Sequence, residues 1–140
     1  MRPADGGGGG AAGGGGGAAF RFHCGQYLFL CVPEIAPWEW HPFTISSAPS
    51  DGVVTCHIKQ APAGPGTFTG RLHALARARR APQSVAVGVD GPYGEWLDAS
   101  RYSRLLLVAG GIGVTPCASI FRELWLRAAA DDREHHQQQQ

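Results

Sequence analysis

The chain has 140 residues, 44% of them hydrophobic, and a formal net charge of +1 at pH 7. That length fits one ordinary domain, or one small domain and part of another. The balanced charge argues against a nucleic-acid-binding protein, which normally carries a strong basic excess. The apolar runs fall well short of the ~20 residues that span a bilayer, and the N-terminus lacks the apolar region of a signal peptide. We therefore expect a soluble chain in a reducing compartment.

The two ends of the chain differ in composition from the part between them. Residues 6–17 are glycine apart from two alanines, and residues 131–140 hold charged residues, two histidines and four glutamines. Neither stretch has enough apolar side chains to offset the entropy lost on ordering it. We expect 1–18 and 131–140 to be disordered, 19–99 to form a first domain, and 100–130 to begin a second one.

The elements predicted in the first domain are short strands with one helix among them. Gly25–Val32 is rich in β-forming residues, Phe43–Ala48 is a short stretch between two prolines, and Val53–Gln60 alternates apolar and polar residues. Thr69–Arg79 has leucines and alanines at helical spacing, and Gln83–Val89 predicts a further strand before the turn DGPYG. Short antiparallel strands with a single helix indicate a small β-barrel.

The second domain opens with a different pattern. Arg104–Gly110 is a continuous apolar run, as in a parallel strand that is buried on both faces. GIGVTP follows, and then a helix for which Thr115 suits the N-cap and Pro116 the first helical position. Strand, glycine turn and helix form the first unit of a nucleotide-binding α/β fold, whose helix N-terminus favours a diphosphate. A tight turn without a ligand is the alternative.

Four cysteines lie far apart in the sequence, without a C-x-x-C pair: Cys24, Cys31, Cys56 and Cys117. This spacing supports neither a metal site nor a disulfide framework, and it favours buried, reduced thiols. Asp90 has no paired acid or histidine nearby, so we assign it no acid–base role. The basic segment Arg71–Arg80 is interpreted as a solvated helix face rather than a nucleic-acid or lipid contact. The sequence predicts no catalytic side chain and no metal ligand.

The segment HPFTISSAP, residues 41–49, is a further candidate binding feature. Pro42 holds His41 in an extended conformation, and on a strand Phe43 lies on the face opposite to Thr44. An aromatic wall beside a hydroxyl suits a flat heterocycle that needs one or two hydrogen bonds. His57 and Lys59 of the next predicted strand share one face and form a cationic pair for phosphates. For His41 the alternative is a structural histidine in a loop. For His57 and Lys59 the alternative is a strand face turned to solvent.

The order of these motifs resembles the flavin reductase module of NADPH oxidases and ferric reductases, in the ferredoxin–NADP reductase superfamily. GQYLFL, EWHPFTISSAP, HIK, T-x-x-L at Thr69–Leu72, DGPYG and GGIGVTPCASI follow one another over about Phe20–Trp125. EWHPFT and DGPYG are most similar to the NADPH oxidase branch. The resemblance implies a six-stranded antiparallel barrel that binds FAD, followed by a domain that binds NADPH.

The resemblance also implies cofactor contacts, residue by residue. In relatives, a cation meets the FAD diphosphate, an aromatic ring packs on the isoalloxazine, and a hydroxyl faces its reactive edge. The positions matching FAD contacts are His41, Pro42, Phe43, Thr44, His57, Ile58, Lys59 and Thr69. Those matching the first NADPH turn are Gly111, Ile112, Gly113, Thr115 and Pro116. Those matching the segment between the two nucleotides are Gly91, Pro92 and Tyr93.

The activity implied by the resemblance is electron transfer from NADPH through FAD to haem, and then to oxygen or ferric iron. The two dinucleotides carry the chemistry, so no side chain needs to act as an acid or base. Haem would lie in a membrane domain of the parent protein, with this module on the cytosolic side. The sequence does not distinguish oxygen from ferric iron as the acceptor.

Departures from the family pattern indicate a fragment. The glycine tract stands where relatives have the first barrel strand, and the NADPH domain stops after its first helix. Lys59 stands where the family often has arginine, which would lose a bidentate contact. We expect the isolated chain to be inactive. Two alternatives are a truncated, non-catalytic FAD-binding or interaction module and a soluble flavin reductase with a protein electron acceptor.

Overall fold

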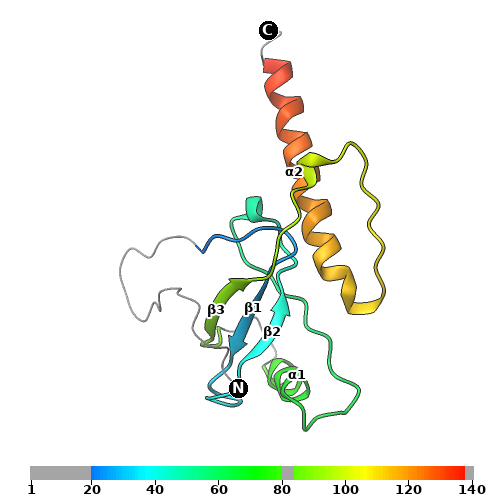
Figure 1. Cartoon of the computed structure of the whole chain (residues 1–140). Coiled ribbons are helices and arrows are strands. Elements are labelled where there is room, and N and C mark those ends of the chain that lie inside the picture. The colour runs from blue at the N-terminus through cyan, green and yellow to red at the C-terminus, as the bar shows by residue number, and fades with distance from the viewer. Residues whose placement is uncertain (1–19, 80–83, 138–140) are drawn as a thin grey trace.

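A computed structural model of the chain describes residues 20–79 and 84–137. In Figure 1 a small sheet and one helix lie at one end, and a long second helix extends away from them. The strands and helices are β1 (Tyr27–Cys31), β2 (His41–Thr44), α1 (Phe68–Ala78), β3 (Gly88–Tyr93) and α2 (Val114–Gln137). Short 3₁₀ turns occupy Pro49–Asp51, Ala99–Arg101 and Gly111–Gly113.

The sheet has the strand order β2-β1-β3, and β1 pairs antiparallel with both neighbours. Tyr27 lies opposite Thr44 on one side and Tyr93 on the other. Leu30 lies opposite His41, so the HPFT segment is hydrogen-bonded along the central strand. This register places the predicted flavin motif at the edge of the sheet.

The core is formed by side chains from three separate segments. Phe22, Leu28 and Ile45 are buried together, and the half-buried Leu30 and Cys56 pack against them. Leu28 and Ile45 are 1% and 0% exposed, so this pair has the greatest burial among the large apolar side chains described. The backbone N–H of Ile45 donates to the carbonyl of Gln26 at 3.0 Å and prolongs the pairing beyond β2.

Three strands are described where the sequence predicted the larger part of a six-stranded barrel. Val53–Gln60 is not a strand, because its backbone pairing is limited to a bond from Ser46 N to Thr55 O of 2.8 Å among the bonds described. Val53 is 63% exposed, so the alternating pattern of this segment has no partner strand to bury its apolar side. The sheet is therefore open, and we describe it as a small antiparallel sheet with helices.

Other boundaries shift by a few residues. β2 begins at His41 rather than Phe43, and α1 matches the predicted helix to within one residue at each end. β3 runs through the segment DGPY that was expected to be a turn. Of the expected strand Gln83–Val89, Gly88 and Val89 belong to β3, residues 84–87 belong to no strand, and Gln83 lies outside the described residues. Of the cysteines, which are all free, only Cys31 is buried and the other three are half-buried.

The segment Arg104–Gly110 is not a strand, contrary to the prediction for the second domain. Leu106 and Val108 are 86% and 82% exposed. A parallel strand is buried only when neighbouring strands and helices cover it, and none of the described elements pairs with this segment. The apolar side chains of this segment are therefore exposed, although side chains of this kind are normally packed inside a sheet.

α2 begins one residue before the position predicted for its N-cap. The 3₁₀ turn Gly111–Gly113 continues directly into the helix at Val114, so Thr115 is already helical. Its hydroxyl donates to the carbonyl of Ile112 at 3.0 Å, as a residue in a first turn does. The helix continues to Gln137, which makes the expected disordered tail helical over 131–137. Residues 1–18 and 138–140 lie outside the described part of the chain.

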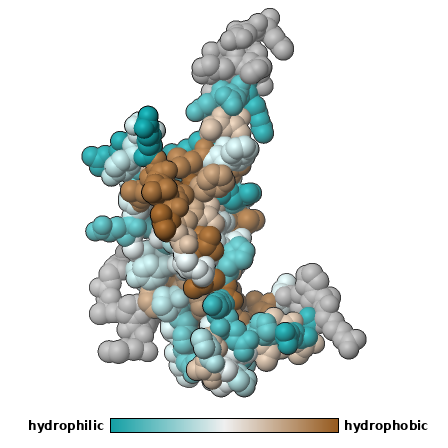
Figure 2. Space-filling view, turned by 90° about the vertical axis from the view of Figure 1, so that its right-hand side faces the viewer, coloured by the Kyte–Doolittle hydropathy of each residue, from teal (hydrophilic) through white to brown (hydrophobic). Residues whose placement is uncertain are grey.

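α2 packs a mixed polar and apolar side against the segment 24–51 and leaves two aromatic side chains exposed. Ser119, Ile120 and Glu123 are 0%, 9% and 6% exposed, whereas Phe121 and Trp125 are 62% and 66% exposed. Figure 2 views the side on which α2 and the segment before it lie, and apolar side chains gather there in one patch. Neither described helix is long and apolar enough to cross a membrane.

Candidate functional site

Three aromatic rings from β2 and α1 form the wall of the candidate site. The ring of His41 stacks on Phe68, with centroids 4.0 Å apart and planes 24° apart. The ring of Phe43 lies 6.3 Å from Phe68 at 29°. Phe68 is buried, whereas His41 and Phe43 are half-buried, so the two motif residues keep accessible surface. The aromatic wall predicted from HPFT is thus completed by a residue from α1 that the motif did not include.

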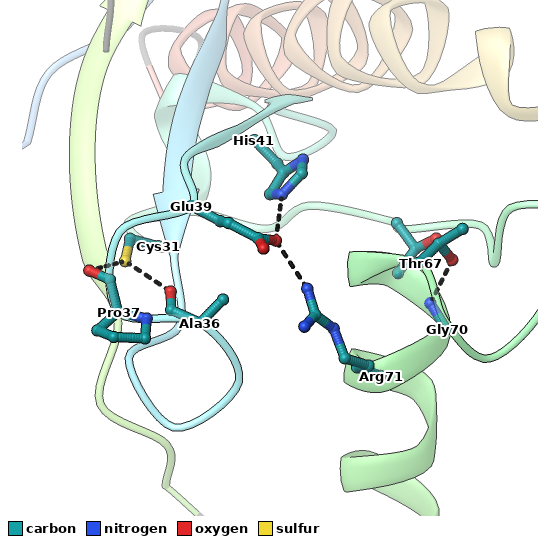
Figure 3. A network of polar contacts seen from close by, with 9 residues as sticks. Cys31, Ala36, Pro37, Glu39, His41, Thr67, Gly70 and Arg71 are labelled. Carbon is teal, nitrogen blue, oxygen red and sulfur yellow. Dashed lines mark hydrogen bonds and ion pairs between the residues drawn. The ribbon is translucent and has the colours of Figure 1, made fainter. Parts of the chain in front are cut away.

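A carboxylate and two nitrogen donors meet beside this wall, as Figure 3 shows. Oε2 of Glu39 accepts from Nη2 of Arg71 at 2.7 Å and lies 3.3 Å from Nε2 of His41. The hydrogen bond from Arg71, and then that from His41, hold the pKa of Glu39 below its ordinary value. Both partners of the Arg71 pair are about half exposed, so the pair adds little to stability.

The first turn of α1 lies close to the loop that precedes it. Thr67 caps the helix, its hydroxyl oxygen accepting from the N–H of Gly70 at 3.1 Å. The hydroxyl of Thr69, a predicted FAD contact, accepts from the N–H of Ala61 at 2.9 Å. A Cβ added to Gly70 would lie 2.3 Å from the carbonyl oxygen of Gly64, so the close approach of helix and loop requires glycine here.

One hydrogen-bond donor of Arg71, its Nε, has no partner among the described residues. This Nε is buried, although 40% of the side chain is exposed. A buried donor without a partner is unfavourable, and a planar guanidinium accommodates two oxygens of a carboxylate or phosphate at once. Two donor side chains, a helix N-terminus and accessible aromatic faces therefore fit a dinucleotide with an aromatic ring and a diphosphate.

The second group of predicted FAD contacts lies in a separate set of interactions. Nδ1 of His57 is 2.7 Å from Oγ of Ser46, and this hydroxyl also donates to the carbonyl of Thr55 at 2.9 Å. This hydroxyl thus joins His57 to the backbone of Thr55. His57 and Lys59 are exposed and Ile58 is half-buried. None of the described contacts joins these three residues to His41.

A cavity of about 290 Å³ adjoins His57 and is lined by Ser46, Ser47, Asp51, Val53, Thr55, His57 and Arg122. The N–H of Ala48 and the guanidinium of Arg122 donate to Asp51 and hold its pKa below the ordinary value. Asp51 is therefore ionised near neutral pH and already paired. This pairing makes the cavity less favourable for a phosphate than the cluster around Arg71.

The residues predicted to lie between the nucleotides belong to β3. Tyr93 packs against Tyr27 and Phe29, with ring centroids 5.9 and 5.6 Å apart. Gly91 approaches β1 so closely that an added Cβ would lie 3.3 Å from Cα of Leu28. Pro92 is half-buried. In this structure the segment has a packing role that the turn interpretation did not include.

The predicted NADPH residues share one turn at the start of α2. Gly111 has a φ of +55°, a left-handed conformation that glycine adopts readily. Gly111, Ile112 and Gly113 are exposed, Thr115 is buried, and Pro116 is half-buried in the first turn. These five residues lie within six positions of the sequence, and no described contact links them to the aromatic wall.

Sequence reasoning missed Phe68, Glu39 and Arg71. Phe68 precedes a predicted FAD contact directly, and Glu39 stands two residues before the HPFT motif, so proximity in sequence was an available signal. Arg71 was assigned to a solvated basic face. Arg71 lies near His41 only because α1 packs beside β2 in the folded chain.

Comparison with known protein families identifies the class. The family of FAD-binding domains matches residues 17–96, and the ferric reductase NAD-binding domain matches residues 102–139. The first match covers more than half of the 140 residues, so the chain belongs to this family of FAD-binding domains. FAD and a nicotinamide dinucleotide are the cofactors of the two matched domains. The family predicted from the motifs is confirmed.

Individual relatives indicate the branch of the family. The chain is 39% identical to a superoxide-generating NADPH oxidase heavy chain of Dictyostelium discoideum, over 75% of its length and 22% of that protein. It is 38% identical to NADPH oxidase 3 of Rattus norvegicus, over 77% of its length and 19% of the relative. It is 37% identical to respiratory burst oxidase homolog protein A of Solanum tuberosum, over 75% of its length and 12% of the relative. The chain therefore spans about a fifth or less of these relatives.

Proposed function

We propose that the chain is the flavin-binding module, with the start of the NADPH-binding domain, of an oxidoreductase of the NADPH oxidase type. The aromatic wall of His41, Phe43 and Phe68 beside the first turn of α1 carries this proposal, because it lies within the FAD-binding match. When bound here, FAD would supply a flavin that can take up a hydride from NADPH and release electrons singly. The protein orients the two dinucleotides and excludes water between them.

Each residue of the HPFT motif has a defined part in holding FAD. His41 provides a donor for the diphosphate, and Pro42 keeps the strand extended at this point. Phe43 packs on the isoalloxazine ring, and the hydroxyl of Thr44 lies at its reactive edge. Thr69 adds a hydroxyl at the helix N-terminus, where the diphosphate is favoured. The stack of His41 on Phe68 supports this assignment because it fixes the ring plane of His41.

The remaining residues extend the site in both directions. His57, Ile58 and Lys59 lie along the diphosphate and adenosine side of FAD, and Gly91, Pro92 and Tyr93 lie between the two nucleotides. The first NADPH turn is formed by Gly111, Ile112, Gly113, Thr115 and Pro116. In the whole protein the sheet is part of a six-stranded antiparallel barrel. This module would lie on the cytosolic side of a haem-bearing membrane domain of the whole protein, which would supply the route of the electrons to oxygen or ferric iron.

Cofactor binding and turnover test the proposal separately. We expect the purified chain to bind FAD, with quenching of flavin fluorescence, but not to oxidise NADPH. NADPH consumption above a control with FAD alone would overturn the expected inactivity. Failure to bind FAD at any concentration tested would overturn the assignment of the site.

A truncated, non-catalytic FAD-binding module is the second candidate. The exposed segment Arg104–Gly110 favours it, because a nicotinamide-binding domain needs that segment buried in a sheet. FAD binding without bleaching of the flavin's visible band by NADPH would support it. Six hydrophobic spans encoded upstream in the genomic sequence would instead support the membrane oxidase as the parent protein.

A further inference from the structure

One carboxylate oxygen receives two donors at the edge of the aromatic wall. Oε2 of Glu39 lies 2.7 Å from Nη2 of Arg71 and 3.3 Å from Nε2 of His41 (Figure 3). Glu39 projects from the loop before β2, whereas Arg71 lies in the first turns of α1. The pair therefore joins the motif strand to the helix, across the place where the diphosphate is proposed to bind.

Arg71 is not satisfied by this contact. Its Nε is buried and lacks an acceptor among the described residues, so the fork of the guanidinium is only partly used. A diphosphate presents several oxygens at the spacing that the fork accommodates. Glu39, with 48% of its side chain exposed, offers Arg71 one oxygen from the solvent side.

The position of Arg71 matches the rest of the proposed site. It follows Gly70, whose N–H belongs to the cap of α1, and it shares Glu39 with His41, which stacks on Phe68. An exposed ion pair contributes little to stability, so a more highly charged anion displaces its carboxylate at small cost. The bound carboxylate then lowers the affinity for that anion, because only the open arrangement is competent to bind it.

We propose that Arg71 is a positioning residue for the diphosphate of the dinucleotide, and that Glu39 is an internal competitor that occupies Arg71 and His41 until the diphosphate displaces it. The inference rests on the proposed function for the identity of the dinucleotide as FAD. If the inference is correct, Arg71 of the basic segment binds a ligand. The apparent affinity for FAD then depends on Glu39.

If the ion pair had only a structural role, the expected effect of replacing Glu39 on ligand binding would be the opposite. If the pair only attaches α1 to the loop, Glu39→Gln and Arg71→Gln weaken ligand binding in the same direction and both lower thermal stability. If Glu39 competes with the ligand, Glu39→Gln tightens binding and Arg71→Gln weakens it. The signs of the two effects decide between these interpretations.

The experiment titrates the full chain with inorganic diphosphate, ADP, FAD and riboflavin by calorimetry and flavin fluorescence. We expect Arg71→Gln to weaken diphosphate, ADP and FAD binding about tenfold, as for the loss of one charge-assisted contact. Riboflavin binding, which involves no phosphate, stays unchanged. Glu39→Gln tightens diphosphate and FAD binding several-fold in the native chain, and by less in the Arg71→Gln background, where only His41 is released.

Arg77→Gln is the matched control, because it removes the same charge from an exposed position near the other end of α1. Equal effects of the Arg71 and Arg77 variants would show a general charge effect and overturn the proposal. So would weaker or unchanged FAD binding in Glu39→Gln. If Arg71→Gln unfolds, Arg71→Lys keeps the charge without the fork, and a loss of diphosphate affinity in this variant is then expected.

The outcomes separate this inference from the proposed function. Diphosphate binding that depends on Arg71, without any FAD binding, supports the anion contact and rejects the flavin assignment. FAD binding that is insensitive to Arg71 and Glu39 retains the flavin assignment and rejects the inference. Binding of neither diphosphate nor FAD rejects both.

Discussion

Phe68 connects the two motifs that the proposed flavin site needs. It lies in α1 yet stacks on His41 of β2, and its burial holds the first turn of the helix against the strand. Neighbouring Gly70 permits the same close approach on the other side, where the loop Gly64–Pro65 passes. Residue by residue, the site thus depends as much on packing at the start of α1 as on the HPFT motif.

Replacing Gly70 tests this close approach. A Cβ at Gly70 would lie 2.3 Å from the carbonyl oxygen of Gly64 and 2.8 Å from Cα of Pro65, which are backbone atoms. We expect Gly70→Ala to destabilise the chain by roughly 1–3 kcal/mol, as overpacking does, measured by urea unfolding. Gly66→Ala is the control, because its added Cβ meets nothing within 4 Å. Equal stability of the two variants would contradict the structure at this point.

The core pair gives a second test at the same scale. Leu28 and Ile45 are almost completely buried and belong to the central strand and the segment after β2. Leu28→Ala leaves a cavity that the sheet cannot close, so we expect a loss of about 2–5 kcal/mol in the free energy of unfolding. Val53→Ala, at a side chain 63% exposed, should change it by less than about 0.5 kcal/mol.

Polar contacts join α2 to the segment 47–51, beside the buried Ile120. The hydroxyl of Ser119 donates to the carbonyl of Ser47 at 2.7 Å, and Glu123 accepts from the N–H of Ser50 at 3.1 Å. Arg122 pairs with Asp51 at 2.6 Å. The existence of this helix was predicted from its sequence. The burial of the apolar Ile120 follows hydrophobic patterning, whereas the burial of Ser119 and Glu123 beside it does not.

Acidic pH tests the attachment of α2. Burial raises the pKa of Glu123, but hydrogen bonds from Arg127 and Ser50 outweigh it and leave this pKa below the ordinary value of 4.5. A carboxyl whose pKa is lower in the folded state stabilises the fold above pH 4.5, and this contribution is lost as the pH falls through the folded pKa. Thermal unfolding of Glu123→Gln should therefore depend less on pH in this range. Asp51, whose pKa is also lowered, leaves a residual dependence.

The whole molecule has an exposed apolar face that its described elements leave uncovered. Leu106 and Val108 from the segment before α2, together with Phe121 and Trp125 of the helix, are each more than 60% exposed. Contiguous apolar surface of this kind is uncommon in soluble monomers. The match of residues 102–139 to an NAD-binding domain explains why an apolar segment followed by a helix is present here at all.

Dye binding tests that surface directly. We expect the native chain to enhance the fluorescence of anilinonaphthalene sulfonate, and Leu106→Lys with Val108→Lys to reduce it. Because both side chains are exposed, the free energy of unfolding should change by less than about 0.5 kcal/mol. Trp38→Lys, at an exposed tryptophan in the loop between β1 and β2, is the control for hydrophobic content alone. A large loss of stability in the double variant would mean that this segment is buried.

The sequence by itself determined the family, the cofactor class and the order of the motifs, because these depend on residue types at short spacings: HPFT, the glycine turn and the cap of α1. It also predicted β1 and α1 closely, since strong local patterns favour them. Only the tertiary structure decided that Val53–Gln60 and Arg104–Gly110 are not strands, because a strand exists through its partners. It alone brought Phe68 to His41 and Arg71 to Glu39, since contacts between residues distant in sequence follow from packing and not from local pattern.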